Sequence, residues 1–513
     1  MGDDFLISAS LDFNSLDRSK IDMVISGLSL TAEEYLNPEY SSTLNIKNEY
    51  YEELLKLYGY SEQKSKDVVS KLNGFYKQIA EHSLLLEEKR NGILPNNFIE
   101  KEDLKNLFSN LDIEKIINKY EDKYDNIVVP DIEEAKAINK YLINENLDIL
   151  KEYIKVNLLD NYATMLDTEY GQVRLDFRNK LYGTDDKGKS QREVAINFVL
   201  NNFQTTISQK YIEKYADQKA IKDFEKIIEE LVSEYKLKLK NNDWLSEETK
   251  EKAILKLDNM KIEVGYPKDW EKREDLYNLS DNYFNNIINI NKATLLDDER
   301  GIINHEQRWG YGFPITVDAG NAVWRNALQF PISILASDMY SDKNTYYQNL
   351  GYFGTIIGHE ISHAFDDQGS LFDENGNMKD WWSDEDKKAF QERVDKVVDY
   401  YNKYEINGMK INGKLTAGEN IADLGGFSCC VEIAKKKNAT KEEMKELFES
   451  YAKIWASKYT DEFLKYMIQN DVHAPNKIRV NAVVSSIDEF YYLYDIKEND
   501  KMYKAPQDRI KVW

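Results

Sequence analysis

Apolar side chains recur every three or four positions through much of the first half of the chain, from about residue 45 to residue 260. This spacing places them on one face of a helix, and charged residues fill the other face. The clearest run comprises Ile221, Phe224, Ile227, Ile228, Leu231 and Tyr235. No fixed repeat period indicates a solenoid. The pattern therefore predicts a series of amphipathic helices joined by short loops.

The spacing of apolar residues changes near residue 260. Residues 261–266 (KIEVGY) predict a strand that ends before a proline. Residues 309–317, which include Tyr311, alternate between apolar and other side chains at period two, which predicts a second strand. After a turn at Gly320, residues 321–335 could form a returning strand.

Helical spacing resumes from residue 346 and is interrupted by turn-rich stretches at residues 373–377 and 407–413. At 513 residues the chain is too long for one ordinary compact core. We therefore expect a mainly α fold with a small β-sheet and two domains, a helical domain at residues 1–255 and a mixed domain at residues 256–513.

Composition narrows the functional classes. Apolar residues make up 42% and charged residues 31%, which fits a folded globular protein. A net charge of −23 argues against a nucleic-acid partner, whose phosphates need a basic surface. The two cysteines are adjacent, so no disulfide framework is expected. No apolar run reaches roughly 18 residues and the start lacks a secretory signal, so we expect no membrane segment.

The motif H-E-x-x-H occurs at His359, Glu360 and His363, within a segment whose spacing suits a helix. On a helix the two histidines lie one turn apart on one face, so both imidazoles can bind one zinc ion. Glu360 lies beside them, where it can activate a water bound to zinc. A third histidine six residues after the second would define a metzincin, but that position is Gly369. The third ligand must therefore be remote.

A carboxylate pair one helical turn apart supplies the best candidate for that ligand. Glu419 and Asp423 lie in the segment ENIAD, so both carboxylates can face the histidine helix. Glu419 would complete a site of two histidines and one glutamate, with one position left open. Asp423 would accept the outer N–H of a ligand histidine and so fix its tautomer.

Several motifs together resemble the neprilysin and endothelin-converting-enzyme family of zinc peptidases. In chain order they are NAVW, FPISIL, GTIIGHEISHAFDDQG, the pair Trp381-Trp382, NGKLTAGENIADLGG, DVHAPNKIRVN and the terminal Val512-Trp513. Weaker similarity reaches back through GYP to GLSLTAEEY, so the resemblance covers nearly the whole chain.

The resemblance implies roles for further residues. His473 would stabilise the oxyanion beside zinc, and Arg479 would hydrogen-bond a substrate carbonyl. Asn321 and Ala322 would pair with the substrate backbone as an added strand does. Ile356 and Trp455 would line the apolar pocket for the residue after the scissile bond.

The resemblance also implies a fold and an activity. The second domain would be a thermolysin-like zinc domain, and the helical domain would complete a chamber that admits only oligopeptides. One zinc ion per chain, a monomer, and cleavage on the amino side of hydrophobic residues are expected. Glu360 would be the general base.

The chain departs from this family in three ways. Roughly a hundred residues that family members carry before this start, with their signal or anchor, do not occur here. Export with such a leader and a cytoplasmic location therefore both stay open. Ile510 replaces an expected cysteine, and the loop after NAVW is shorter than usual.

Alternatives to a zinc endopeptidase are a nucleotide hydrolase, an inactive or catalytically weak peptide-binding protein on the same scaffold, and a zinc aminopeptidase. No motif identifies the acidic anchor that an aminopeptidase needs. Residues 183–190 satisfy the P-loop pattern G-x-x-x-x-G-K-S, but a charged amphipathic segment precedes them and Asp185 and Asp186 would repel phosphate. Residues 373–384 imitate a calcium loop, but Met378 occupies the position that requires glycine, which indicates a turn.

Overall fold

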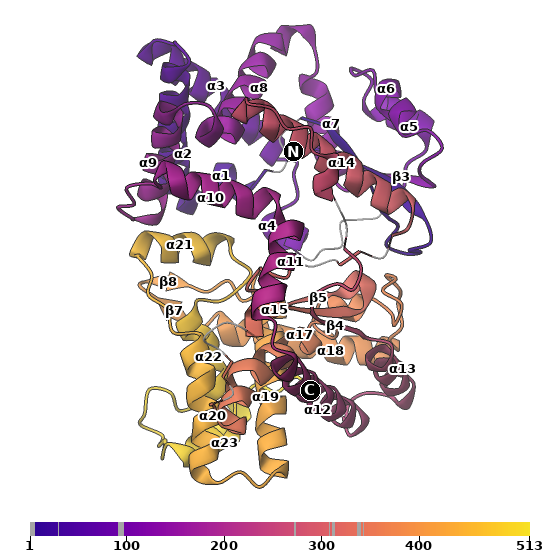
Figure 1. Cartoon of the computed structure of the whole chain (residues 1–513), viewed down its shortest axis with the longest axis vertical. Helices are drawn as coiled ribbons and strands as arrows, with labels where there is room; N and C mark the ends of the chain where they lie inside the picture. The colour runs from indigo at the N-terminus through magenta and orange to yellow at the C-terminus, as the bar shows by residue number, and fades with distance from the viewer. Residues whose placement is uncertain are drawn as a thin grey trace. The chain divides into compact units, whose positions relative to one another are not determined.

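A computed structural model describes residues 6–28, 30–90, 97–270, 273–306, 308–309, 313–335, 340–341 and 343–513. The chain is mainly helical with small sheets, as the sequence predicted. It divides into two compact units (Figure 1). Unit 1 comprises Met1–Asn202, Lys272–Arg308 and Thr460–Phe463, and unit 2 comprises Phe203–Glu271, Trp309–Tyr459 and Leu464–Trp513. No helix among the described residues is both long and apolar enough to cross a membrane.

The compact units differ from the domains expected at residues 1–255 and 256–513. Residues 203–255 belong to unit 2, and residues 272–308 return to unit 1. The boundary at residue 255 was placed where the spacing of apolar residues changes. The compact units are instead defined by contacts between segments that are far apart in the chain. The two-domain boundary at residue 255 stays a prediction.

Unit 1 packs helices against each other beside a three-stranded sheet. The strands are β1 (Ser8–Phe13), β2 (Ile21–Ser26) and β3 (Asn126–Val128), with β2 antiparallel to β1 and parallel to β3. The helices are α1 (Glu33–Leu36), α2 (Ser41–Leu57), α3 (Glu62–Ala80), α4 (Leu86–Arg90), α5 (Lys101–Leu107), α6 (Glu114–Lys119), α7 (Ile132–Tyr141), α8 (Leu147–Tyr162), α9 (Thr168–Tyr182), α10 (Gln191–Asn202) and α14 (Tyr283–Ile303). Their apolar faces form two buried clusters, one between α2, α3, α7 and α8 and one over the sheet.

Unit 2 contains the segment with the H-E-x-x-H motif. Its sheets are the strands β4 (Lys261–Gly265), β6 (Ala327–Pro331) and β5 (Gly320–Ala322) in that order, and the hairpin β7 (Glu405–Ile406) and β8 (Met409–Lys410). Its helices are α11 (Gln204–Tyr215), α12 (Gln218–Lys240), α13 (Glu247–Asp258), α15 (Ile332–Leu335), α16 (Tyr346–Asn349), α17 (Thr355–Ser362), α18 (Asp384–Tyr401), α19 (Ala417–Lys436), α20 (Lys441–Ile454), α22 (Asn476–Val484) and α23 (Asp488–Leu493). Helix α21 (Asp461–Asn470) runs from unit 1 into unit 2.

The predicted elements of unit 2 are confirmed in part. The helix predicted from Ile221 to Tyr235 is α12, and those apolar residues are buried. The strand predicted at residues 261–266 is β4, which pairs in parallel with β6. The returning strand predicted within residues 321–335 is instead a tight hairpin of β5 and β6 followed by α15. Asn326 makes that turn with a φ of 46°.

The strand predicted at residues 309–317 is wrong over its described part. Residues 313–317 form a turn, in which the Thr316 N–H donates to the Phe313 carbonyl at 2.7 Å. Pro314 lies at the second turn position, where its fixed φ is favourable and its missing N–H cannot support a ladder. Tyr311 lies outside the described residues. Alternating side chains alone did not reveal this proline turn.

A buried carboxyl group lies in the core of unit 1. Glu134 of α7 is 3% exposed, and its Oε1 accepts a hydrogen bond from Ser83 Oγ at 3.0 Å. Burial raises the pKa of Glu134 to about 7, although Lys89 and Ser83 act to lower it. Because a residue with a Cβ at Gly27 would meet Glu134 Oε2 at 2.5 Å, that glycine makes room for the carboxyl group.

We expect the raised pKa of Glu134 to make unit 1 less stable as the pH rises. The folded state holds the proton up to about pH 7 and the unfolded state releases it near pH 4.5, so stability is lost between these values. Glu134→Gln should remove this loss and exceed the wild type by up to about 3 kcal/mol at pH 8. Urea unfolding at pH 5 and pH 8 measures it, with the exposed neighbour Glu133→Gln as control. Equal pH dependence of wild type and Glu134→Gln would contradict the assignment.

Candidate metal centre

Helix α17 carries the first part of the site. A π-helical turn at Leu350–Gly354 leads into it, and the helix is buried along nearly its whole length. His359 is 8% exposed and Glu360 is 7% exposed. His363 is the C-cap residue, so both histidines lie in the last turns of one helix and on one face, as predicted.

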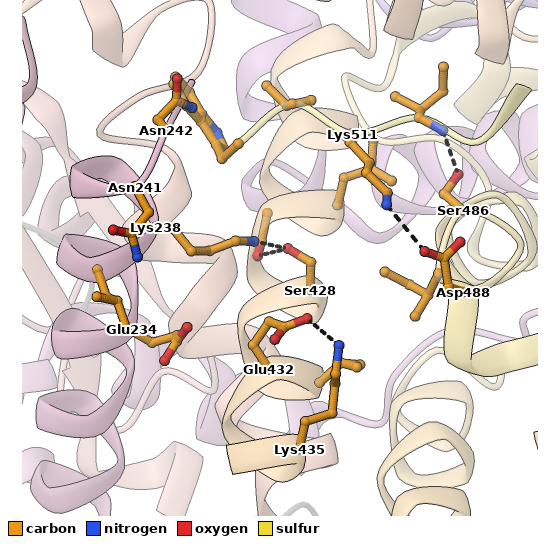
Figure 2. Close-up of a pocket in the computed structure, with 18 of the residues that line it drawn as sticks. Glu234, Lys238, Asn241, Asn242, Ser428, Glu432, Lys435, Ser486, Asp488 and Lys511 are labelled. Carbon is orange, nitrogen blue, oxygen red and sulfur yellow. Dashed lines mark hydrogen bonds and ion pairs between the residues drawn. The ribbon is translucent and has the colours of Figure 1, made fainter. Parts of the chain in front are cut away.

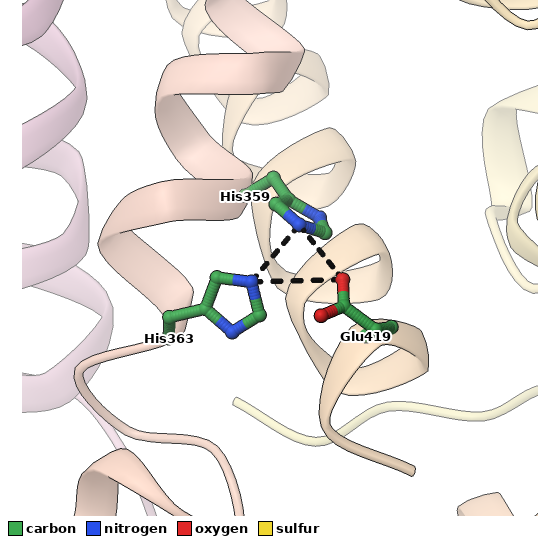
Figure 3. Close-up of side chains that lie close together, drawn as sticks. All are labelled: His359, His363 and Glu419. Atoms are coloured by element: carbon green, nitrogen blue, oxygen red, sulfur yellow. Dashed lines mark hydrogen bonds and ion pairs between the residues drawn. The ribbon is translucent and has the colours of Figure 1, made fainter. Parts of the chain in front are cut away.

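Two histidines of α17 and one glutamate of α19 converge on one point (Figure 3). His359 Nε2 and His363 Nε2 lie 3.0 Å apart. Glu419 Oε2 lies 3.1 Å from His359 Nε2 and 3.6 Å from His363 Nε2. Within the part of the chain that the structure describes, this is the one cluster of three potential metal-binding side chains whose donor atoms all come together.

A backbone contact between two glycines allows this convergence. A Cβ at Gly358 would lie 2.7 Å from the Gly426 Cα, and one at Gly426 would lie 2.4 Å from the His359 nitrogen. Real Cβ atoms do not approach backbone so closely, so α17 and α19 can pack at this distance only with glycine at both positions. Helix α12 braces the pair, because Tyr235 donates its hydroxyl to the Gly358 carbonyl at 3.2 Å.

Carboxylates hold the outer nitrogen of each histidine. His359 Nδ1 lies 2.8 Å from Asp423 Oδ1, and His363 Nδ1 lies 2.6 Å from Asp366 Oδ2. Such partners fix Nδ1 as the N–H and leave Nε2 free to bind a metal. Arg479 donates to both oxygens of Asp423 at 2.7 Å. Burial alone would raise the pKa of Asp423, but Arg479 and His359 lower it to about 2.

The electrostatics of the site favour a bound cation. Glu419 Oε2 is buried and makes no well-aligned hydrogen bond, although imidazole nitrogens surround it. Burial lowers the pKa of His363, but Glu419 and Asp366 raise it to about 10, so the carboxylates stabilise positive charge there. Two neutral imidazoles and one carboxylate are a donor set that suits Zn²⁺ with one open position. The residues present therefore fit a zinc ion.

His473 lies beside the same carboxylate. Its Nε2 is 3.0 Å from Glu419 Oε2, and its Nδ1 is 2.8 Å from Asp471 Oδ1. Burial lowers the pKa of His473, but Asp471 and Glu419 raise it to about 9. These two carboxylates therefore favour the charged form of the imidazole and hold it close to the convergence point of His359, His363 and Glu419.

Glu360 and the edge strand β5 lie on another side of the site. The Glu360 carboxylate makes no hydrogen bond with another described residue, and burial raises its pKa. Asn321 of β5 donates its side-chain amide to the Glu360 carbonyl at 2.7 Å. Among the described residues β5 pairs only with β6, so Asn321 and Ala322 lie on an edge strand, next to the helix that carries the two histidines.

Ile356 and Trp455 are both partly buried against the core of unit 2. Ile356 precedes the histidines on α17, and the Trp455 ring stacks on Arg479, whose Cζ is 3.8 Å from the ring centroid. Arg479 thus contacts both the Trp455 ring and Asp423, the carboxylate that holds His359.

Sequence reasoning missed two carboxylates of the site. Asp366 follows His363 by three residues and Asp471 precedes His473 by two. Only these short separations could have indicated them, and carboxylates are frequent at such separations in an acidic chain.

Other candidate sites lack a comparable arrangement. Residues 183–190 follow helix α9 and are exposed, so no strand precedes the P-loop pattern. Residues 373–377 form a turn, as predicted. A cavity of about 720 Å³ lies between α12, α19 and the C-terminal residues (Figure 2). Its charged side chains largely bind one another, such as Lys435 with Glu432 at 2.8 Å and Lys511 with Asp488 at 3.2 Å.

Known proteins resemble the chain in sequence and fold. Residues 1–267 and residues 321–510 each match peptidase family M13. A neutral endopeptidase of Lactobacillus helveticus is 31% identical over 500 residues, covering 93% of this chain and 74% of that protein. A neutral endopeptidase of Lactococcus lactis subsp. lactis is 30% identical over 410 residues, covering 79% of this chain and 64% of that protein. The crystal structure of PepO from Lactobacillus rhamnosis HN001 gives a TM-score of 0.91 at 26% identity, covering 100% of this chain and 82% of that one.

These similarities, together with the two imidazoles and the carboxylate, define a metalloendopeptidase by class. The chain belongs to peptidase family M13. The expected mainly α, thermolysin-like architecture is confirmed by the PepO fold. The chain spans 64% of the length of the Lactococcus lactis relative. An enclosed chamber stays a prediction.

Replacement of the contact glycine should disturb the metal centre. We expect Gly426→Ala to push α19 away from α17, because its Cβ would meet backbone atoms that cannot rotate aside. Stability should fall by about 1–3 kcal/mol and zinc affinity by at least about tenfold. Thermal unfolding and chelator competition measure both effects. The control is Gly74→Ala in α3, where the new Cβ would meet no atom within 4 Å apart from the local backbone of its own helix. Unchanged zinc affinity in Gly426→Ala would contradict the role of the contact.

Proposed function

We propose that this chain is a zinc-dependent endopeptidase that hydrolyses oligopeptides on the amino side of hydrophobic residues. The observation that carries the proposal is the convergence of His359, His363 and Glu419, with each histidine oriented by its own carboxylate. These three side chains would hold one zinc ion per chain. Bound zinc would polarise the scissile carbonyl and lower the pKa of water.

Glu360 is the general base in this proposal. Its carboxylate is buried beside the histidines and makes no competing hydrogen bond with a described residue. It would take the proton of the attacking water and deliver it to the leaving amine. Burial raises the pKa of Glu360 toward neutral pH, where a carboxyl group both accepts and donates a proton efficiently.

Charged side chains around the site would stabilise the reacting peptide. His473, which Asp471 orients, would donate to the carbonyl oxygen as negative charge develops on it. Arg479 uses two N–H groups on Asp423, and its remaining donors would bind a substrate carbonyl. Asn321 and Ala322 would align the substrate backbone along the open edge of β5.

An inactive peptide-binding protein on the same scaffold is the second candidate. Asn321 supports peptide alignment whether or not cleavage follows, because it lies on an edge strand. Measured turnover separates the two proposals.

Loss of the Glu360 carboxylate should separate metal binding from catalysis. We expect Glu360→Gln to keep about one zinc per chain but to lose at least about 100-fold in kcat, because an amide cannot accept the proton. Glu419→Ala should lose the metal itself, because only two of the three protein ligands, the imidazoles, remain. Metal analysis and peptide-cleavage kinetics test both. Substantial turnover by Glu360→Gln would remove Glu360 from this role, and wild-type protein well below half an equivalent of zinc would contradict the proposed function.

The pocket assigned to Ile356 and Trp455 should determine specificity. Phe, Leu or Ile after the scissile bond should be favoured, because burial of each is worth roughly 1.5 to 3 kcal/mol. Trp455→Ala should weaken this preference. Arg479→Ala should slow the cleavage of all peptides, because Arg479 holds Asp423 as well as the Trp455 ring. Mass spectrometry of a digested peptide library measures the cut sites. Cleavage mainly before Lys, Arg, Asp or Glu would contradict the pocket assignment.

A further inference from the structure

A buried lysine lies behind the metal centre, outside the proposed catalytic residues. Lys256, near the end of α13, is 1% exposed. Its Nζ donates to three backbone carbonyls, those of Ala364 at 2.8 Å, Gly369 at 2.7 Å and Phe372 at 2.7 Å. The rings of Phe365 and Trp381 lie within 5.8 Å of the same nitrogen.

The three carbonyls belong to one loop, residues 364–372, which directly follows the metal helix. Ala364 is the residue after the C-cap residue His363, so its carbonyl lies just beyond the C-terminal end of α17. A positive charge is favourable at this position because the helix dipole is negative there. The Lys256 ammonium group thus hydrogen-bonds to the start, the middle and the end of the loop.

Asp366 is the residue of this loop that reaches the metal centre. Its Oδ2 accepts from His363 Nδ1 at 2.6 Å. Its Oδ1 accepts from the backbone N–H groups of Gln368 at 2.9 Å and Gly369 at 2.6 Å. The Gly369 N–H therefore donates to Asp366, and the Gly369 carbonyl accepts from Lys256. Gly369 and Asp366 together connect the lysine to His363.

The protonation state of Lys256 matters for this arrangement. Burial lowers the pKa of Lys256 to about 7, although Asp366, Asp373 and Glu374 act to raise it. Three carbonyl acceptors match the three N–H groups of an ammonium ion, whereas a neutral amine would leave one carbonyl unpaired. The geometry therefore corresponds to the protonated form.

We propose that Lys256 is a positioning residue of the metal centre, which fixes the 364–372 loop so that Asp366 holds His363 in the metal-binding tautomer. This inference rests on the proposed zinc site. It assigns to α13, a helix that supplies no ligand, a part in setting zinc affinity.

The experiment compares zinc dissociation constants by chelator competition. Lys256→Met should weaken zinc binding about tenfold, and Asp366→Asn about 10- to 100-fold, as is usual for partners of ligand histidines. The double variant should be no weaker than Asp366→Asn within about a factor of two, because both changes act on one path. The control is Lys252→Met, one turn earlier on α13, where the lysine is half-buried and pairs with Glu248. It should leave zinc affinity unchanged.

A cobalt(II) spectrum separates positioning from general stability. The visible bands of cobalt-loaded Lys256→Met should shift from those of the wild type, because ligand geometry changes. If Lys256→Met does not fold, Lys256→Gln replaces it, since its amide keeps two N–H donors. If the zinc affinity of Lys256→Met lies within a factor of about two of the wild type, the role of Lys256 is overturned. The same holds if the double variant loses the product of the two single losses. Wild-type protein that binds no zinc would contradict the proposed function instead.

Discussion

The proposed metal centre depends on how closely two helices can approach. Gly358 and Gly426 remove the side chains that would otherwise separate α17 from α19. With the backbones in contact, an imidazole from one helix and a carboxylate from the other reach the same point. Larger residues at the crossing would increase the distance between the helices and leave the donors too far apart to share an ion. Any chemistry at the site therefore depends on the packing of α17, α12 and α19 in unit 2.

Around that contact, both histidines are held by carboxylates that have hydrogen-bond partners of their own. Arg479 holds Asp423, which holds His359, and the 364–372 loop holds Asp366, which holds His363. Buried charges are costly unless they are paired and hydrogen-bonded, and these chains provide the pairing. Their common result is that both histidines point Nε2 toward Glu419, where it is the ring nitrogen available to a metal. A flexible carboxylate would not impose this, so the outer partners matter nearly as much as the ligands.

Much of the site could be predicted from the sequence because its spacing follows helix geometry. His359 and His363 are four residues apart, as are Glu419 and Asp423, and each pair lies on one helical face. What the sequence could not reveal depends on contacts between distant segments. Asp366 and Lys256 meet through a loop without periodicity, and β3 is too short for its alternation to be recognised. The strand expected at residues 309–317 shows the opposite error, since a period-two pattern runs through a proline turn.

Helix α19 places a proposed ligand, a supporting carboxylate and a contact glycine at residues 419, 423 and 426, along one stripe of its surface. Each residue of an α-helix turns the chain by about 100°, so an insertion or deletion of one residue inside this stretch would rotate its two ends onto different faces. A replacement inside this stretch leaves the stripe in place, although it must still fit the packing, because residues 420–427 are all buried. The length of this segment is thus a requirement in addition to its packing, and genetic variation here is expected to accumulate as conservative replacements and not as insertions or deletions.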